Sequence, residues 1–195
     1  MRYRTSEGEM IPIIVIIIIN VLFYITVNIA NMMDKPLISL LALGVTTFLH
    51  EPWTIFTYMF THQDFMHLLA NMITFYFYGS FLNRITGVRT FLTIYFVGGL
   101  VAGLFILLIA MSPYYLTIGA SGAVFALGGA LAVLVPKLKV FIFPIPVPMP
   151  LWIAIVVGFL VLAIIPGVSW QGHLGGLISG LLAGWYLRRR LRLII

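Results

Sequence analysis

WQGHLGGLISGLLAGWYL, residues 170–187, contains no charged side chain and is followed at once by Arg188, Arg189 and Arg190. A helix that crosses a bilayer needs about 20 mostly apolar residues. Basic residues collect on the cytoplasmic side of such helices. We therefore predict a transmembrane helix over this stretch. Its glycines recur at every fourth position and form a stripe of the kind that lets two helices pack closely in lipid; they are Gly172, Gly176, Gly180 and Gly184.

The composition of the whole chain agrees with this prediction. Of the 195 residues, 62% are hydrophobic and 8% are charged, whereas a soluble domain has about 45–50% apolar and about 25% charged residues. The absence of cysteine excludes a disulfide scaffold. The net charge of +6 comes from basic residues that flank apolar runs. We therefore expect a lipid bilayer as the partner of these charges, and no nucleic acid.

Apolar runs of bilayer length predict an all-α polytopic membrane protein with six transmembrane helices. Six such helices leave no room for a separate soluble domain, so residues 1–195 are predicted to form a single membrane domain. The predicted spans are Met10–Ala30, Met66–Leu82, Phe91–Met111, Ala120–Val135, Pro150–Ile165 and Trp170–Leu187.

The distribution of basic residues predicts the orientation. With both termini in the cytoplasm, Lys35 alone lies outside, and the other ten of the eleven basic residues lie inside. Two connections stand out. Asn31–Phe65 is rich in aromatic residues and is expected in the outer leaflet, and Pro136–Pro150 is too rich in proline to be helical.

The acidic residues exclude several classes of membrane protein. They are Glu7, Glu9, Asp34, Glu51 and Asp64, and none lies inside a predicted span. An aspartyl intramembrane protease and a proton-coupled transporter both need carboxylates at membrane depth. The His-Glu-x-x-His motif of zinc proteases is also absent. We therefore predict none of these three classes, and we predict no metal site, because His62 and His67 are five residues apart and would lie on different faces of a helix.

Polar residues instead open the three even-numbered spans, all at the outer side. His67 and Asn71 lie four residues apart and so share a helix face. Ser121 begins the fourth span within Gly119-Ala120-Ser121-Gly122, and His173 begins the sixth. The fourth span also has small residues at intervals of four, so close packing against the glycine stripe would bring Ser121 beside His173.

A serine hydroxyl next to a neutral imidazole can act as a nucleophile with its general base. We predict a Ser121–His173 dyad, with His67, Asn71 and the N–H of Ser121 as donors to an oxyanion. Each residue alone has a simpler interpretation. A membrane serine usually bonds to its own backbone, and an interfacial histidine usually packs or lines a pore. His50 and His62 are interpreted as solvated or structural, and the aromatic residues at 75–78 as lipid-facing or core.

Three motifs together resemble the rhomboid family of intramembrane serine proteases. His62-Gln-Asp-Phe-Met-His67-Leu-Leu-Ala-Asn71 resembles its His-x4-His-x3-Asn pattern. Gly119-Ala120-Ser121-Gly122 resembles its Gly-x-Ser-Gly motif, and His173-Leu-Gly-Gly176-Leu-Ile-Ser-Gly180 resembles its sixth-helix motif. The order and spacing of these motifs agree from about Trp53 to Gly184.

The resemblance implies a compact six-helix enzyme of a prokaryotic cell membrane, with its active site facing outward. Ser121 would be the nucleophile, His173 the base, and His67 with Asn71 the oxyanion site, supported by Gly119, Gly122 and Phe125. The substrates would be transmembrane helices of other proteins. The fifth span and residues 166–169 would form the gate, no cofactor would be needed, and a monomer would be sufficient.

Two positions depart from the family pattern. The family often has Trp-Arg in its first outer loop, where this chain has Trp53-Thr54. It often has a tyrosine four residues after the nucleophile, where this chain has Phe125. We expect the Phe125 ring to stack on His173 but to orient it less tightly than tyrosine would.

Two alternative functions remain open. A catalytically inactive relative could bind transmembrane helices, although such proteins usually lose the serine or the histidine, and this chain keeps both. A small channel would need polar residues through the full depth of the bilayer, whereas those recognised here stop near its outer third. We rank the protease first, the inactive binder second and the channel third.

Overall fold

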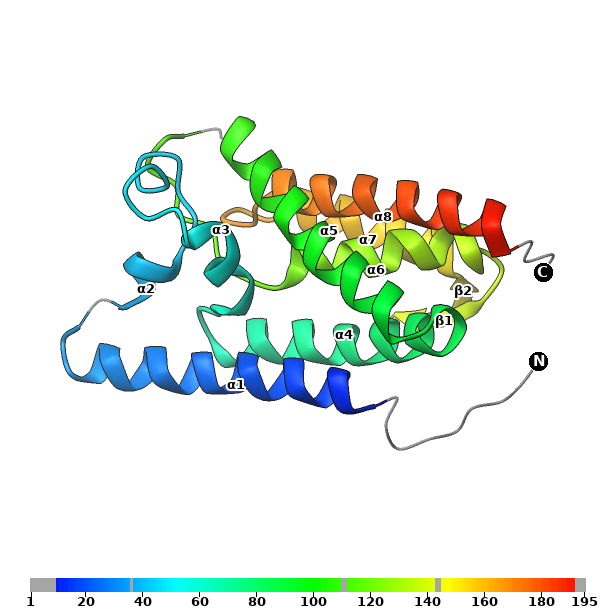
Figure 1. The fold of residues 1–195 in the computed structure, drawn as a ribbon, viewed down its shortest axis with the longest axis horizontal. Coiled ribbons are helices and arrows are strands. Elements are labelled where there is room, and N and C mark those ends of the chain that lie inside the picture. Colours follow the sequence, from blue (N-terminus) through cyan, green and yellow to red (C-terminus); the bar gives the residue numbers. More distant parts are fainter. Residues whose placement is uncertain (1–9, 36, 110–111, 143–144, 192–195) are drawn as a thin grey trace.

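The structure, a computed structural model, describes residues 10–35, 37–109, 112–142 and 145–191. In this part of the chain, long helices form a bundle with a small β-hairpin at one end (Figure 1). The long helices are α1 (Ile11–Met32), α4 (Phe65–Thr86), α5 (Val88–Leu108), α6 (Ser121–Leu134), α7 (Leu151–Ala163) and α8 (Trp170–Leu191). The shorter elements are α2 (Leu37–Leu41), α3 (Thr54–Thr57), the 3-10 helix η2 (Tyr58–Phe60), β1 (Lys139–Ile142) and β2 (Ile145–Pro150).

Each of the six predicted spans coincides with one long helix. The largest differences are at α4, which continues to Thr86, and at α8, which continues to Leu191. The third span was predicted to end at Met111, which lies outside the described residues. The helix itself ends at Leu108. The mostly helical fold is therefore as predicted.

Two helices have the length and composition of a membrane span by themselves. These are α1 and α5, with mean hydropathies of 2.7 and 2.4. Two more apolar helices, α6 and α7, are shorter. Much of α1 presents large apolar side chains to the outside of the bundle, including Ile11, Ile18 and Leu22, as expected for a surface in contact with lipid. The full set of six spans stays a prediction.

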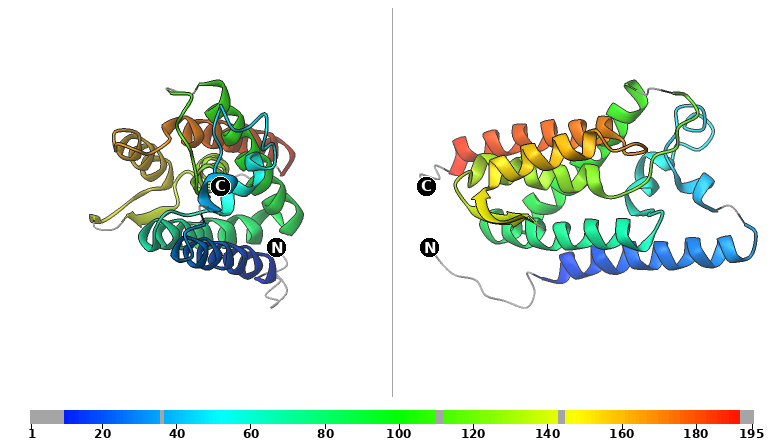
Figure 2. Two further views of the ribbon diagram at one scale, coloured as in Figure 1. Left: turned by 90° about the vertical axis from the view of Figure 1, so that its left-hand side faces the viewer. Right: turned by 180° about the vertical axis from the view of Figure 1, so that it is seen from behind.

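The long helices alternate in direction. Helices α4, α6 and α8 run one way, and α1, α5 and α7 run the other way (Figures 1 and 2). One end of the bundle therefore holds the last turns of α4 and α8 and the β-hairpin. Seven of the eight exposed basic side chains of the described residues gather at this end, and Lys35, just after α1, lies at the other; the seven are Arg84, Arg89, Lys137, Lys139, Arg188, Arg189 and Arg190.

Helices α6 and α8 form the closest packing in the bundle. A Cβ atom added to Gly176 or Gly180 would clash with the backbone of Gly122 or Ala126 of α6, and one added to Gly184 would lie 2.7 Å from the carbonyl oxygen of Ala130. The predicted contact between the two small-residue stripes is therefore confirmed. Helix α6 is almost entirely buried because α4, α5, α7 and α8 surround it.

The proline-rich connection is not helical, as predicted, and it forms an antiparallel hairpin. Strands β1 and β2 pair Lys139 with Pro150 and Val140 with Met149. On the opposite side, the loop between α1 and α4 is fixed by side-chain hydrogen bonds to backbone carbonyls. Trp53 Nε1 donates to Leu40 O over 2.9 Å, and the buried Thr54 hydroxyl donates to Glu51 O over 2.6 Å.

Candidate active site

The side chains of Ser121 and His173 are in direct contact. Ser121 is the first residue of α6, and His173 lies in the first turn of α8. The distance from Ser121 Oγ to His173 Nε2 is 2.8 Å. Close packing of the two glycine-rich helices places them together, as the sequence predicted. When the imidazole is neutral with its proton on Nδ1, Nε2 accepts the hydroxyl proton, which is the orientation needed in a nucleophile and base pair.

The imidazole of His173 is held by packing. Its ring lies on the ring of Phe125, with centroids 4.7 Å apart and an interplanar angle of 35°. The expected contact with Phe125 is therefore present. Nδ1 of His173 is buried and has no hydrogen-bond partner among the described residues. No side chain in this part of the chain orients the ring from that nitrogen, so the pair has no third member here.

Gly119 allows His67 to approach the serine. Its φ of +120° lies in a region that L side chains rarely adopt. A Cβ atom there would lie 2.7 Å from His67 Nε2 and 3.9 Å from Ser121 Oγ. The same small space therefore borders both side chains. Any residue other than glycine would push against the imidazole of His67.

His67 and Asn71 lie on the first two turns of α4. Asp64 caps this helix by accepting the His67 N–H over 2.8 Å. The amide of Asn71 donates one hydrogen bond to His67 O, also over 2.8 Å, and the side chain is largely buried. A carboxamide carries two N–H donors, so a second one can serve a ligand. His67, Asn71 and Ser121 all line the same cavity.

His62 is structural rather than solvated. Its side chain is fully buried, Nδ1 donates to Phe60 O over 3.3 Å, and Nε2 accepts the Ala120 N–H over 3.5 Å. Burial, together with the nearby His67, lowers the pKa of His62 to about 3. His62 therefore ties the loop before α4 to the backbone next to Ser121. Its role was not resolved from sequence because it depends on a contact between segments 58 residues apart.

The dyad opens into a cavity of about 970 Å³. Its walls come from α4, α6, α7 and the start of α8, and include the loop at residues 166–169. The cavity extends along α4 to Thr74 and Tyr78. The sequence had suggested that polar groups stop near the outer third of the helices, but in the structure they continue deeper along α4. Tyr78 was interpreted as lipid-facing or core, but it lines the cavity; its spacing of seven from Asn71 was the available signal.

Gly128 of α6 makes room for Tyr78. A Cβ atom on Gly128 would lie 3.1 Å from the Tyr78 ring and 2.6 Å from Ile155. Gly128 lies two helical turns after Ser121 on α6 and adjoins Tyr78 and Ile155, which line the same cavity as Ser121. Gly129 faces the backbone of α8 instead.

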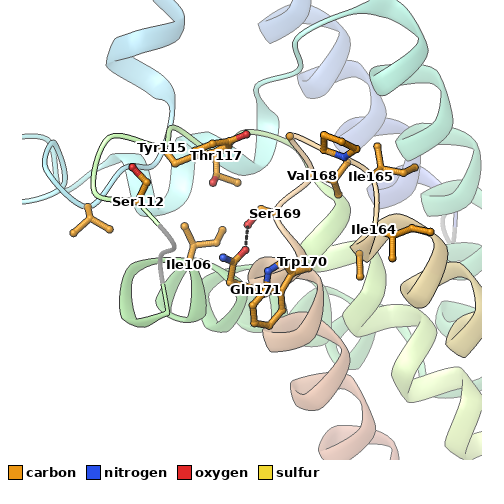
Figure 3. Close-up of a pocket in the computed structure, with 14 residues that line it drawn as sticks. Ile106, Ser112, Tyr115, Thr117, Ile164, Ile165, Val168, Ser169, Trp170 and Gln171 are labelled. Carbon is orange, nitrogen blue, oxygen red and sulfur yellow. Dashed lines mark hydrogen bonds between the residues drawn. The ribbon is translucent and has the colours of Figure 1, made fainter.

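A second cavity, of about 480 Å³, is lined by the loop at residues 166–169 together with the start of α8 and the segment at residues 112–117 (Figure 3). The four loop residues line both cavities, as do Ile106 and Thr117, so the two cavities are neighbours at this loop. Ser169 Oγ donates to Gln171 Oε1 over 3.3 Å, and Gln171 Nε2 donates to Ile109 O over 3.3 Å. These bonds fix the base of the loop where α8 begins, and the loop itself borders open space in both cavities.

The electrostatic setting suits an oxyanion rather than a cation. The N–H groups of the first turn of α6 have no intrahelical carbonyl partner, and the N-terminus of a helix favours negative charge. Ser121 occupies this position. Within the described residues, no group of three or more histidine or acidic side chains could hold a metal ion.

The profile of the Rhomboid domain matches residues 49–190, which is well over half of the chain. The chain belongs to the rhomboid family. Rhomboid proteins are membrane proteins, and the family includes intramembrane serine proteases. The matched residues begin after α1 and α2 and include every candidate site residue, from His67 to His173.

Named rhomboid relatives come from distant organisms. The chain is 32% identical over 139 residues to Rhomboid protein 1, mitochondrial, from Saccharomyces cerevisiae, covering 67% of this chain and 40% of that protein. It is 32% identical to RHOMBOID-like protein 1 of Arabidopsis thaliana, over 70% of this chain and 34% of that protein. It is also 32% identical to the rhomboid protease GluP of Bacillus subtilis, over 68% of this chain and 25% of that protein. The matched region thus spans less than half of each of these relatives.

Proposed function

We propose that this rhomboid protein is an intramembrane serine protease that hydrolyses peptide bonds in or near transmembrane helices of other membrane proteins. The observation that carries the proposal is the 2.8 Å contact between Ser121 Oγ and His173 Nε2. Family membership supports the reaction class, because the protease GluP of Bacillus subtilis is among the relatives. A serine hydroxyl and a neutral imidazole at this distance form the pair of nucleophile and general base that the reaction needs.

In the proposed mechanism, His173 removes the proton from the Ser121 hydroxyl as Ser121 Oγ attacks the carbonyl carbon of the scissile bond. His67, the free N–H of Asn71 and the backbone N–H of Ser121 donate hydrogen bonds to the oxyanion. His173 then gives the proton to the leaving amine, and the C-terminal fragment departs with a new amino terminus, while the N-terminal fragment stays bound to Ser121 as an acyl-enzyme. A water molecule, deprotonated by His173, hydrolyses the acyl-enzyme and restores the serine. No step requires a metal ion or a cofactor.

The proposed topology is a single six-span domain with both ends in the cytoplasm. Positively charged residues favour the cytoplasmic side, and those of the described residues, apart from Lys35, gather at the end of the bundle away from Ser121. The active site would therefore face the outer side of the cell membrane. Substrate helices would reach it between α4 and α7, with α7 and the loop at residues 166–169 as the gate.

The proposal can be tested with purified protein reconstituted in lipid vesicles together with a set of transmembrane peptides. Wild type should release two fragments per cleaved peptide, identified by mass spectrometry, and Ser121→Ala should release none while keeping the thermal stability of the wild type. Ser179→Ala is the matched control, since Ser179 lies almost two turns after His173 on α8 and its hydroxyl, within the described residues, donates to Gly176 O. Equal cleavage by Ser121→Ala would refute the mechanism.

A further inference from the structure

A polar stripe runs down α4 from the candidate active site toward the middle of the bundle. Asn71, Thr74 and Tyr78 are spaced by three and four residues, which places them on one face of the helix. All three line the cavity that contains Ser121 and His173. Because a helix rises about 1.5 Å per residue, Tyr78 lies about 10 Å deeper than Asn71.

The hydroxyl group of Tyr78 is available to a ligand. The ring is seated against Gly128 of α6 and next to Ile155 of α7, so its position is fixed by packing. No hydrogen bond to this hydroxyl occurs within the described part of the chain. One turn above it, the Thr74 hydroxyl donates to Ala70 O over 2.8 Å. Its oxygen can still accept a hydrogen bond.

The wall opposite this stripe is apolar and open. It is formed by α7, whose residues Ala154, Gly158 and Val161 line the cavity. A Cβ atom added to Gly158 would meet nothing within 4 Å. Within the described residues, α7 packs on α6 and α8 rather than closely against α4. The space between α4 and α7 can therefore accept another helix. That helix would turn small or apolar residues toward α7, and its other side would face the polar stripe of α4.

The cavity is deeper than peptide hydrolysis requires, since the reacting groups lie only at its outer end. If an apolar substrate helix covered the Tyr78 hydroxyl, that hydroxyl would lose its hydrogen bonds to water, which costs free energy. A helix with a hydrogen-bonding side chain at the depth of Tyr78 would avoid that cost. Such a contact would make substrate choice depend on a position away from the scissile bond.

We propose that Thr74 and Tyr78 recognise a polar, uncharged side chain (serine, threonine, asparagine or glutamine) in the substrate helix, about seven residues deeper than the cleaved bond. This inference rests on the proposed function, because it concerns the substrate of the same site. Hydrogen bonds between helices in membranes correspond to a preference of roughly three- to tenfold. Thr74 and Tyr78 are positioning residues for the substrate and do not take part in the bond cleavage.

The experiment uses two model transmembrane peptides that differ at a single position, seven residues beyond the cleavage site, which carries Asn in one peptide and Leu in the other. For wild type, kcat/KM should be about three- to tenfold higher for the Asn peptide. Tyr78→Phe and Thr74→Val should each reduce that ratio, and the double variant should bring it near one. Moving the Asn by two residues in either direction should also abolish the preference, because the side chain would leave the stripe.

Tyr76→Phe is the matched control, because Tyr76 is a tyrosine of the same helix that is 43% exposed and outside the cavity. Asparagine also weakens a helix, which could speed cleavage without any contact with Tyr78. That effect would be the same in wild type, Tyr76→Phe and Tyr78→Phe. A ratio that Tyr78→Phe leaves unchanged would therefore overturn the proposal.

Failure of the proposed function would be seen separately. Binding of the two peptides, carrying a fluorophore, is measured with the Ser121→Ala variant in detergent micelles. A binding preference for the Asn peptide that is lost in Ser121→Ala/Tyr78→Phe would support the recognition site even if wild type cut neither peptide. Equal binding of both peptides, with equal cleavage of both by wild type, would refute the recognition site and leave the protease intact.

Discussion

Ser121 Oγ and His173 Nε2 lie 2.8 Å apart although 52 residues separate them in the sequence. The contact depends on backbone packing between α6 and α8, because residues with larger side chains than glycine at positions 176 and 180 would clash with the backbone of α6. The chemistry of this site is therefore coupled to the packing of two helices.

Gly176→Ala tests this coupling. The added methyl group would overlap the Gly122 backbone, one residue from the nucleophile, so α8 must move away from α6. We expect a loss of about 1–3 kcal/mol in stability, typical of overpacking, together with a fall in cleavage rate. Thermal unfolding followed by circular dichroism, and cleavage of a model peptide, measure the two effects.

Gly158→Ala is the control for that substitution, because nothing lies within 4 Å of a Cβ atom at position 158. Its melting temperature should equal or exceed that of the wild type, since alanine favours a helix over glycine by about 1 kcal/mol. If Gly176→Ala were as stable and active as the wild type, the close packing of α6 and α8 would not be needed to hold the dyad.

Asn71→Ala tests the oxyanion site. Removal of one donor to an oxyanion can lower kcat by up to about 10³-fold. We expect a large loss of kcat, with little change in the yield of folded protein, because Asn71 makes its hydrogen bond within its own helix turn. Steady-state kinetics in detergent separate kcat from KM. An unchanged kcat would assign Asn71 to helix packing alone.

His62 predicts how stability depends on pH. Burial holds the pKa of His62 at about 3 in the folded chain, against about 6.5 for an exposed histidine. Below pH 6.5 His62 therefore binds a proton in the unfolded chain but stays neutral in the folded chain. The contribution of His62 to the free energy of unfolding is thus lost as the pH falls from 6.5 toward 3. Protonated Nε2 would also face the N–H of Ala120, which it accepts in the neutral form.

The measurement is the difference in melting temperature between pH 7.5 and pH 4.5. His62→Gln should show a smaller difference than wild type, whereas His50→Gln, at an exposed position in the loop before α3, should match wild type. The same pH dependence in His62→Gln and wild type would mean that other groups cause the acid destabilisation.

The sequence was sufficient for features set by local pattern. Apolar runs located the six long helices to within a few residues, and the glycine spacing correctly paired α6 with α8. Each of these depends on periodicity within a helix, which the order of residues encodes directly.

Features that depend on contacts between distant segments were not predictable in the same way. The hairpin of β1 and β2 requires cross-strand pairing in a proline-rich segment. His62 becomes buried only because a loop folds over the residues before Ser121. Tyr78 lines the cavity because Gly128, on another helix, has no side chain to exclude it.

The most direct test of the dyad is labelling with a fluorophosphonate probe, which reacts with activated serines, followed by mass spectrometry to locate the modified residue. Wild type, Ser121→Ala, His173→Ala and the control Ser179→Ala are compared in detergent, each shown to be folded by its melting temperature. We predict a single label on Ser121 in wild type and in Ser179→Ala, and no label in Ser121→Ala or His173→Ala. Folded wild type that takes no label, or that keeps it in His173→Ala, would contradict the account of Ser121 as a nucleophile activated by His173.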